Sequence, residues 1–109
     1  MKKALFLIAD GFEDLQLFVP YYRLKELGIQ VVISALVEGI VMGKHGYRAE
    51  SEVSFNEVAA SDFEILIIPG GTSPESLRLQ EEALSSARYF VQENLLVGAL
   101  GHGCQLLIS

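Results

Sequence analysis

The sequence predicts an α/β domain built on a mostly parallel sheet. Short apolar runs recur along the chain, as is typical of strands that are buried on both faces. Segments with helical spacing of apolar residues lie between these runs, and glycine or proline ends most segments. The 109 residues are enough for one domain, residues 1–109, and too few for two.

The first half of the chain predicts a strand, a helix and a second strand. The apolar run ALFLIA at 4–9 predicts the first strand. A helix is indicated next, ended by Gly28, with Pro20 expected near its first turns, where proline is tolerated best. QVVISAL at 30–36 predicts the second strand. The apolar positions with helical spacing are Leu15, Val19, Tyr22 and Leu27.

The second half continues the alternation after a glycine-rich stretch. Residues 48–55 alternate in part, which favours a half-exposed antiparallel hairpin. EILIIP at 64–69 and LLVGAL at 95–100 predict two more buried strands. A helix is predicted over 81–93, and 101–109 is expected to turn and begin another. The apolar face predicted for the helix over 81–93 is Leu84, Ala87, Phe90 and Val91.

Composition excludes several classes of protein. Half of the residues are hydrophobic and the mean hydropathy is +0.35, which excludes an extended disordered chain. The net charge of −6 argues against nucleic-acid binding, and the absence of a basic amphipathic face argues against a membrane role. No apolar run is long enough for a membrane span or a signal peptide. With one cysteine, the sequence predicts no disulfide and a cytoplasmic protein.

A parallel sheet places ligands at the carboxyl ends of its strands, so the segments after the strands are the candidates for a site. Asp14 is a candidate N-cap, and Glu13 or Gln16 could point at this edge, or have a solvated or capping role. Lys44 and His45 lie in a glycine-bounded loop, where they either act in the site or are simply exposed. Two histidines are too few to predict a metal site. The segments are 10–16, 44–47, 69–75 and 101–105.

The turn after the third predicted buried strand is the first candidate. Gly70 and Gly71 follow Pro69, and this tight turn would let the backbone approach a ligand, or would simply end the strand. Glu75 begins the next helical segment, where a carboxylate also complements the helix dipole.

The last predicted strand runs into G-H-G-x-Q, which is the context of a nucleophile elbow. Its tip is Gly101, which has no side chain, so the elbow shape is expected without a nucleophile. His102 is either a base beside the tip or a histidine packed at the junction. Cys104 is either a reactive thiol near a helix N-terminus or a small apolar side chain in the core.

Together these motifs resemble the DJ-1/PfpI (ThiJ) family over the whole chain, especially its intracellular-protease branch. The motifs are ADGFEDLQLFVPYYRLKELG, GKHGY, ILIIPGG and GHGCQLLIS. The resemblance implies a flavodoxin-like fold with helices on both faces, related to class I glutamine amidotransferases. It further implies cysteine peptidase, glyoxalase or deglycase activity, a role in stress protection, no cofactor, and homo-oligomers that are dimers or hexamers.

The resemblance also implies which residues form the site. The family's elbow cysteine falls on Gly101 and the histidine after it on His102. The family's glutamate after the first strand falls on Gln16, and the glutamate supplied by a neighbouring subunit falls on Glu75. Cys104 stands where the family usually has proline. The histidine and one glutamate are therefore kept, whereas the nucleophile and its partner glutamate are lost.

Three interpretations follow from these substitutions. The first is a catalytically impaired or non-catalytic domain that acts through assembly or ligand binding, because covalent catalysis needs a nucleophile. The second is an active hydrolase or deglycase that uses His102, Glu75 and Cys104. The third is a fragment without function of its own, since family chains continue past the elbow helix by roughly another third, and the chain is expected to be C-terminally shortened.

Overall fold

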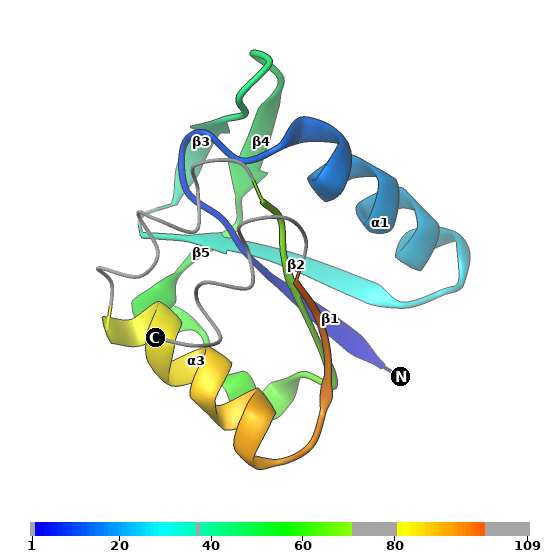
Figure 1. Cartoon of the computed structure of the whole chain (residues 1–109), viewed down its shortest axis with the longest axis vertical. Coiled ribbons are helices and arrows are strands. Elements are labelled where there is room, and N and C mark those ends of the chain that lie inside the picture. The colour runs from blue at the N-terminus through cyan, green and yellow to red at the C-terminus, as the bar shows by residue number, and fades with distance from the viewer. Residues whose placement is uncertain (1, 37, 71–80, 100–109) are drawn as a thin grey trace.

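The computed structural model describes residues 2–36, 38–70 and 81–99, and Figure 1 shows how they are arranged. Parallel strands form the middle of the molecule, and a separate hairpin lies beside the start of the first helix. The elements are β1 (Lys3–Leu7), α1 (Asp14–Glu26), β2 (Gln30–Ala35), β3 (Gly39–Met42), β4 (Arg48–Ser51), β5 (Val53–Ser54), the 3-10 turns η1 (Phe55–Glu57) and η2 (Ala60–Asp62), β6 (Ile65–Ile68), α3 (Glu81–Gln92) and β7 (Leu96–Ala99).

The five-stranded sheet has the order β5-β2-β1-β6-β7, and every neighbouring pair in it is parallel. The chain passes from β1 outward to β2, returns to the other side of β1 for β6, and continues to β7. This is the flavodoxin-like order, with β5 added at one edge. The predicted α/β fold with a mostly parallel sheet is confirmed.

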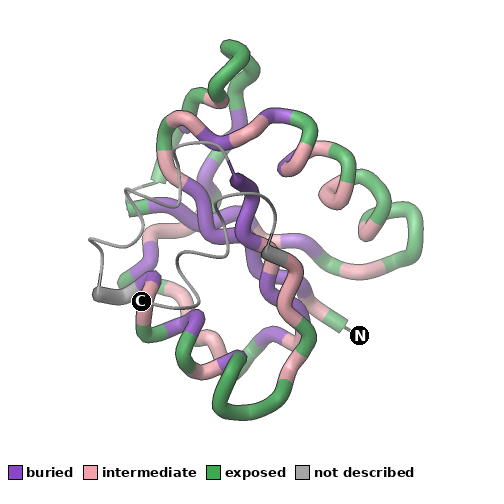
Figure 2. Tube along the Cα trace, in the orientation of Figure 1, coloured by how far each residue is buried: buried purple, intermediate pink, exposed green. Residues whose placement is uncertain are grey.

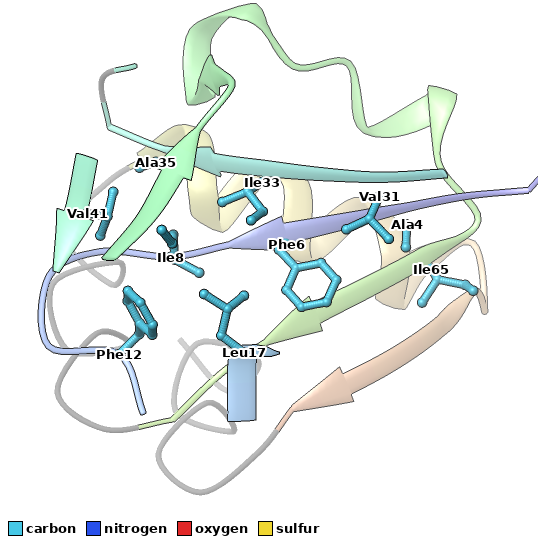
Figure 3. Packing of buried hydrophobic residues seen from close by; sticks show 11 residues of the cluster. Ala4, Phe6, Ile8, Phe12, Leu17, Val31, Ile33, Ala35, Val41 and Ile65 are labelled. Atoms are coloured by element: carbon cyan, nitrogen blue, oxygen red, sulfur yellow. The ribbon is translucent and has the colours of Figure 1, made fainter. Parts of the chain in front are cut away.

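The core consists of two layers, one on each face of the sheet. Alternate side chains of β1 enter different layers: Phe6 lies in the layer under α1, whereas Leu5 lies in the layer under α3. Figure 3 shows Phe6 and Ile8 of the first layer beside Leu17 of α1. Phe90 of α3 belongs to the second layer. The continuous apolar runs of the sequence are explained by this burial on both faces.

The apolar positions that indicate α1 in the sequence are not the ones that pack on the sheet. Leu15, Val19 and Tyr22 are 68%, 63% and 58% exposed, and Leu27 after the helix is exposed as well. The helix packs on the sheet through the neighbouring stripe, in which Leu17 is fully buried. In Figure 2 most of α1 is exposed or half-buried, in contrast to the strands beside it. The half-buried members of the packed stripe are Phe18, Tyr21 and Leu24.

Three further expectations need correction. Val91 of α3 is 53% exposed, and Ala83 takes a buried place on the packed face together with the predicted Ala87 and Phe90. Of residues 48–55, only β4 is an arm of the hairpin, pairing antiparallel with β3, whereas β5 pairs parallel with β2 in the main sheet. Pro20 lies in the middle of the 13-residue α1, where it donates no hydrogen bond to the carbonyl of Gln16.

None of the helices in the described ranges is both long enough and apolar enough to cross a bilayer.

Candidate functional site

The candidate site lies at the carboxyl ends of β1 and β6, where the sheet order changes direction. A doubly wound sheet opens a crevice at this position, because the connections leave these two strands on opposite sides. The loop after β1 and the turn after β6 meet here, since the Glu13 N–H donates to the carbonyl of Gly70 over 3.0 Å. Two of the segments predicted from the sequence, 10–16 and 69–75, are thus joined at this edge through Glu13 and Gly70.

Gln16 points back to the same edge from the first turn of α1. Its side-chain oxygen Oε1 accepts a hydrogen bond of 2.7 Å from the N–H of Gly70. This contact joins residues 54 positions apart and is part-buried. Of the alternatives left open for Gln16, the side chain takes the one that faces the edge of the sheet, and its amide holds the Gly70 turn in place. The amide is neutral, so it gives this edge a hydrogen-bonding group without a charge.

Glu13 rather than Asp14 is the N-cap of α1. The side chain of Glu13 accepts from the N–H of Leu15 over 3.4 Å, and α1 begins at Asp14. The other carboxylate oxygen of Glu13 lies 3.3 Å from Nε2 of His45. The imidazole of His45 is more than half exposed, and the Glu13 side chain is largely covered. This pair brings the third predicted segment, 44–47, to the same edge.

Asp14 has a different role from the one predicted. It is only 2% exposed, and its carboxylate oxygens accept hydrogen bonds from the N–H groups of His45, at 2.8 Å, and Tyr47, at 3.0 Å. Asp10 adds a similar contact, because its Oδ1 accepts from the N–H of Met42 over 2.9 Å. Two carboxylates, Asp10 in the loop after β1 and Asp14 at the start of α1, therefore hold the hairpin beside the site.

Glu13, Asp14 and His45 are also the group of metal-ligand side chains that the described ranges bring together, with ligand atoms within 4.8 Å of one another. Each oxygen of Asp14 already accepts a backbone N–H, and the Glu13 carboxylate is the N-cap acceptor. These hydrogen bonds account for both carboxylates without an ion. We assign the group a structural role.

Lys44, the other candidate in the loop 44–47, is exposed. The remaining predicted site residues lie outside the described residues. They are Gly71, Glu75, Gly101, His102 and Cys104. The structure thus brings together Glu13, Gln16, His45 and Gly70 from the predicted set. The docking of the hairpin through Asp10 and Asp14 was missed by sequence reasoning. Polar residues after a buried strand were the available signal, but it does not specify which backbone groups they bind.

The sheet order defines the class of protein: a flavodoxin-like α/β domain, whose candidate site lies at the switch point of the sheet. The sequence profile described as the DJ-1/PfpI family matches residues 2–109. The chain belongs to the DJ-1/PfpI family.

Named relatives agree with this assignment. The chain is 45% identical over 107 residues to Deglycase PfpI of Pyrococcus furiosus, a match that covers 98% of this chain and 64% of the relative. It is 41% identical over 107 residues to a deglycase of Thermococcus kodakarensis, with the same coverage of both chains. The chain therefore spans about two thirds, 64%, of the length of these relatives.

A solved structure supports the same fold. A two-domain protein of Anabaena variabilis that contains DJ-1/ThiJ/PfpI-like and ferritin-like domains superposes with a TM-score of 0.95 at 30% sequence identity. The match covers 99% of this chain and 32% of that protein.

Proposed function

We propose that this chain is a catalytically impaired or non-catalytic DJ-1/PfpI domain that acts by binding a small ligand at the β1–β6 edge or through assembly. The observation that carries the proposal is the hydrogen bond from the Gly70 N–H to the side-chain oxygen of Gln16. Gln16 occupies the position at which the family resemblance implies a glutamate. Its amide keeps the contact with the turn but has no acidic proton to share with a thiol.

The second support is the elbow sequence. Glycine at position 101 offers no atom for covalent catalysis, although its freedom of backbone conformation suits an elbow. Without a thiolate the partner carboxylate has no function to perform, and a glutamine avoids the cost of a lone charge at a part-buried position. The two substitutions are therefore consistent with each other. Two relatives named above are deglycases, so deglycase activity is the one to test on this chain.

Turnover of a 2-oxoaldehyde and of a glycated peptide tests this proposal. We expect no cysteine-dependent turnover. The chain and its Cys104→Ser variant should therefore turn over both substrates at the same rate, and that rate should equal the background measured with heat-denatured protein. Turnover that the chain shows and the Cys104→Ser variant loses would contradict the proposal. It would favour the alternative in which Cys104 acts as the nucleophile with His102 and Glu75.

For assembly, we propose that a second copy of this chain covers the outer stripe of α1, defined as Leu15, Val19 and Tyr22. These three large apolar side chains occupy one face of the helix and are each more than half exposed. Leu15 and Tyr22 also line a hollow of about 430 Å³, together with Phe18, Tyr47 and the charged residues Asp14 and Arg48. A twofold interface uses the same patch on both copies, so a single helix face can pair with itself.

Changing Val19 to glutamate should raise the dissociation constant of this assembly at least about 100-fold. The twofold symmetry repeats the substitution, so the interface loses two valines and gains two charges. The matched control is Val91→Glu, which changes a similarly exposed valine of α3 on the other side of the sheet. Sedimentation or light scattering across a dilution series measures the effect. Equal dissociation constants for the chain and Val19→Glu would overturn the proposed surface.

A further inference from the structure

We propose that Asp14 is a positioning residue: its carboxylate fills the turn Gly43–Tyr47 as a built-in anion and so holds His45 against Glu13 at the edge of the candidate site. The significance of that edge rests on the proposed function. The placement itself rests only on contacts in the structure, and its tests require no activity.

The turn is shaped to surround an anion. The Gly43 N–H donates to the carbonyl of Tyr47 over 2.7 Å, and Gly46, with φ of +89°, donates to the carbonyl of Gly43 over 3.0 Å. These bonds curl the backbone so that the N–H groups of His45 and Tyr47 point at the Asp14 carboxylate. Backbone N–H groups that converge in a turn form a concave binding site for an anion.

The fit between the turn and the carboxylate leaves no space for a larger residue. A Cβ atom added to Gly43 would collide with Asp14, coming within 2.6 Å of its Cγ atom. Glycine is therefore required at position 43 by the carboxylate itself. The charge of Asp14 is further favoured by its place in the first turn of α1, at the positive end of the helix dipole.

A continuous series of contacts links this carboxylate to the site. Asp14 fixes the backbone of His45, whose imidazole lies 3.3 Å from the Glu13 carboxylate. Glu13 in turn donates its backbone N–H to Gly70, the residue that also bonds Gln16. The start of the turn has a second tether, because the N–H of Lys44 donates to the carbonyl of Phe12 over 2.7 Å. The His45 imidazole itself is more than half exposed, and within the described residues Glu13 is its polar partner. Removing Asp14 should therefore loosen the His45 end of the turn and move the imidazole away from Glu13, while Lys44 and the sheet stay in place.

Chemical rescue of Asp14→Ala is the first test. We expect the backbone amides of His45 and Tyr47 to exchange with deuterium about 10- to 100-fold faster in the variant, because each loses a charge-assisted hydrogen bond. Formate has the size and charge of the missing group and should restore slow exchange, whereas neutral formamide should not. Amides of β6 and α3 serve as internal controls for the fold. Unchanged exchange at His45 and Tyr47, or rescue by formamide as well as by formate, would overturn the role of the carboxylate.

Asp14→Asn provides a second variant of the same shape, which keeps one acceptor and replaces the other by an N–H₂ group. We expect one of the two amides to exchange faster and the other to stay protected. Should the alanine variant fail to fold, this isosteric variant still decides the point, because equal protection of both amides would contradict the inference.

A double-mutant comparison separates positioning from a general structural effect. At one fixed pH, the ring resonances of His45 should shift in Glu13→Gln, shift to a similar extent in Asp14→Ala, and shift no further in the double variant. Formate should reverse the shift in Asp14→Ala but not in Glu13→Gln. Independent, additive shifts would mean that Asp14 does not act through the Glu13–His45 contact. Neither outcome depends on turnover, so failure of the proposed function would leave this result standing.

Discussion

Replacing Leu17 by alanine is expected to destabilise the fold by about 2–5 kcal/mol, whereas Leu15→Ala should change the free energy of unfolding by less than about 0.5 kcal/mol. Leu17 is fully buried in the layer between α1 and the sheet, so its removal leaves a cavity beside β1. Leu15 is the same residue type, two positions earlier on the same helix, and is 68% exposed. The pair therefore isolates burial from helix propensity.

Urea unfolding followed by circular dichroism measures both variants. The protein concentration should be low enough for light scattering to show single chains, because Leu15 belongs to the outer stripe proposed for assembly. Similar losses for the two variants would contradict the packing of α1 described above.

Introducing a nucleophile at the elbow should produce cysteine-dependent turnover. We expect Gly101→Cys combined with Gln16→Glu to exceed the parent chain by about 100-fold or more, since positioned acid–base groups typically contribute at least that factor to a reaction. Gln16 already contacts the Gly70 turn at the β1–β6 edge, and a glutamate of the same length could keep that contact. Gly101→Cys alone should gain less, because the amide of Gln16 cannot share a proton with the thiol.

The same assay with a 2-oxoaldehyde and a glycated peptide measures this gain. Gln16→Glu without the new thiol is the control and should remain inactive. A double variant that alkylates readily at position 101 yet turns over neither substrate would contradict the view that these two substitutions account for the impairment.

The parallel sheet could be predicted from the sequence because strands that are buried on both faces have continuous apolar sequences. A strand such as 4–9 has no polar positions, and glycine marks several of the ends. The packed face of α1 could not be predicted in the same way. The helix carries two neighbouring apolar stripes, one with Leu17 and one with Leu15, and spacing alone does not show which of them meets the sheet.

The site was predictable only at the level of segments. Residues after the strands were expected to meet at one edge, and Gln16 and Gly70 do meet there. The role of Asp14 depends on backbone N–H groups 31 and 33 residues away. Nearly every residue has such a group, so the sequence does not show which of them Asp14 binds. A first-turn aspartate reads as a cap, and only the docked hairpin shows its other partners.

The alkylation rate of Cys104, compared between the folded chain and the chain unfolded in denaturant, tests the central claim most directly. The chain has one cysteine, so the reaction of a single thiol is observed. The proposal that the chain has no catalytic thiol predicts that Cys104 reacts no faster in the folded chain than in the unfolded one. A folded rate at least about tenfold above the unfolded rate would reveal an activated cysteine and contradict the account.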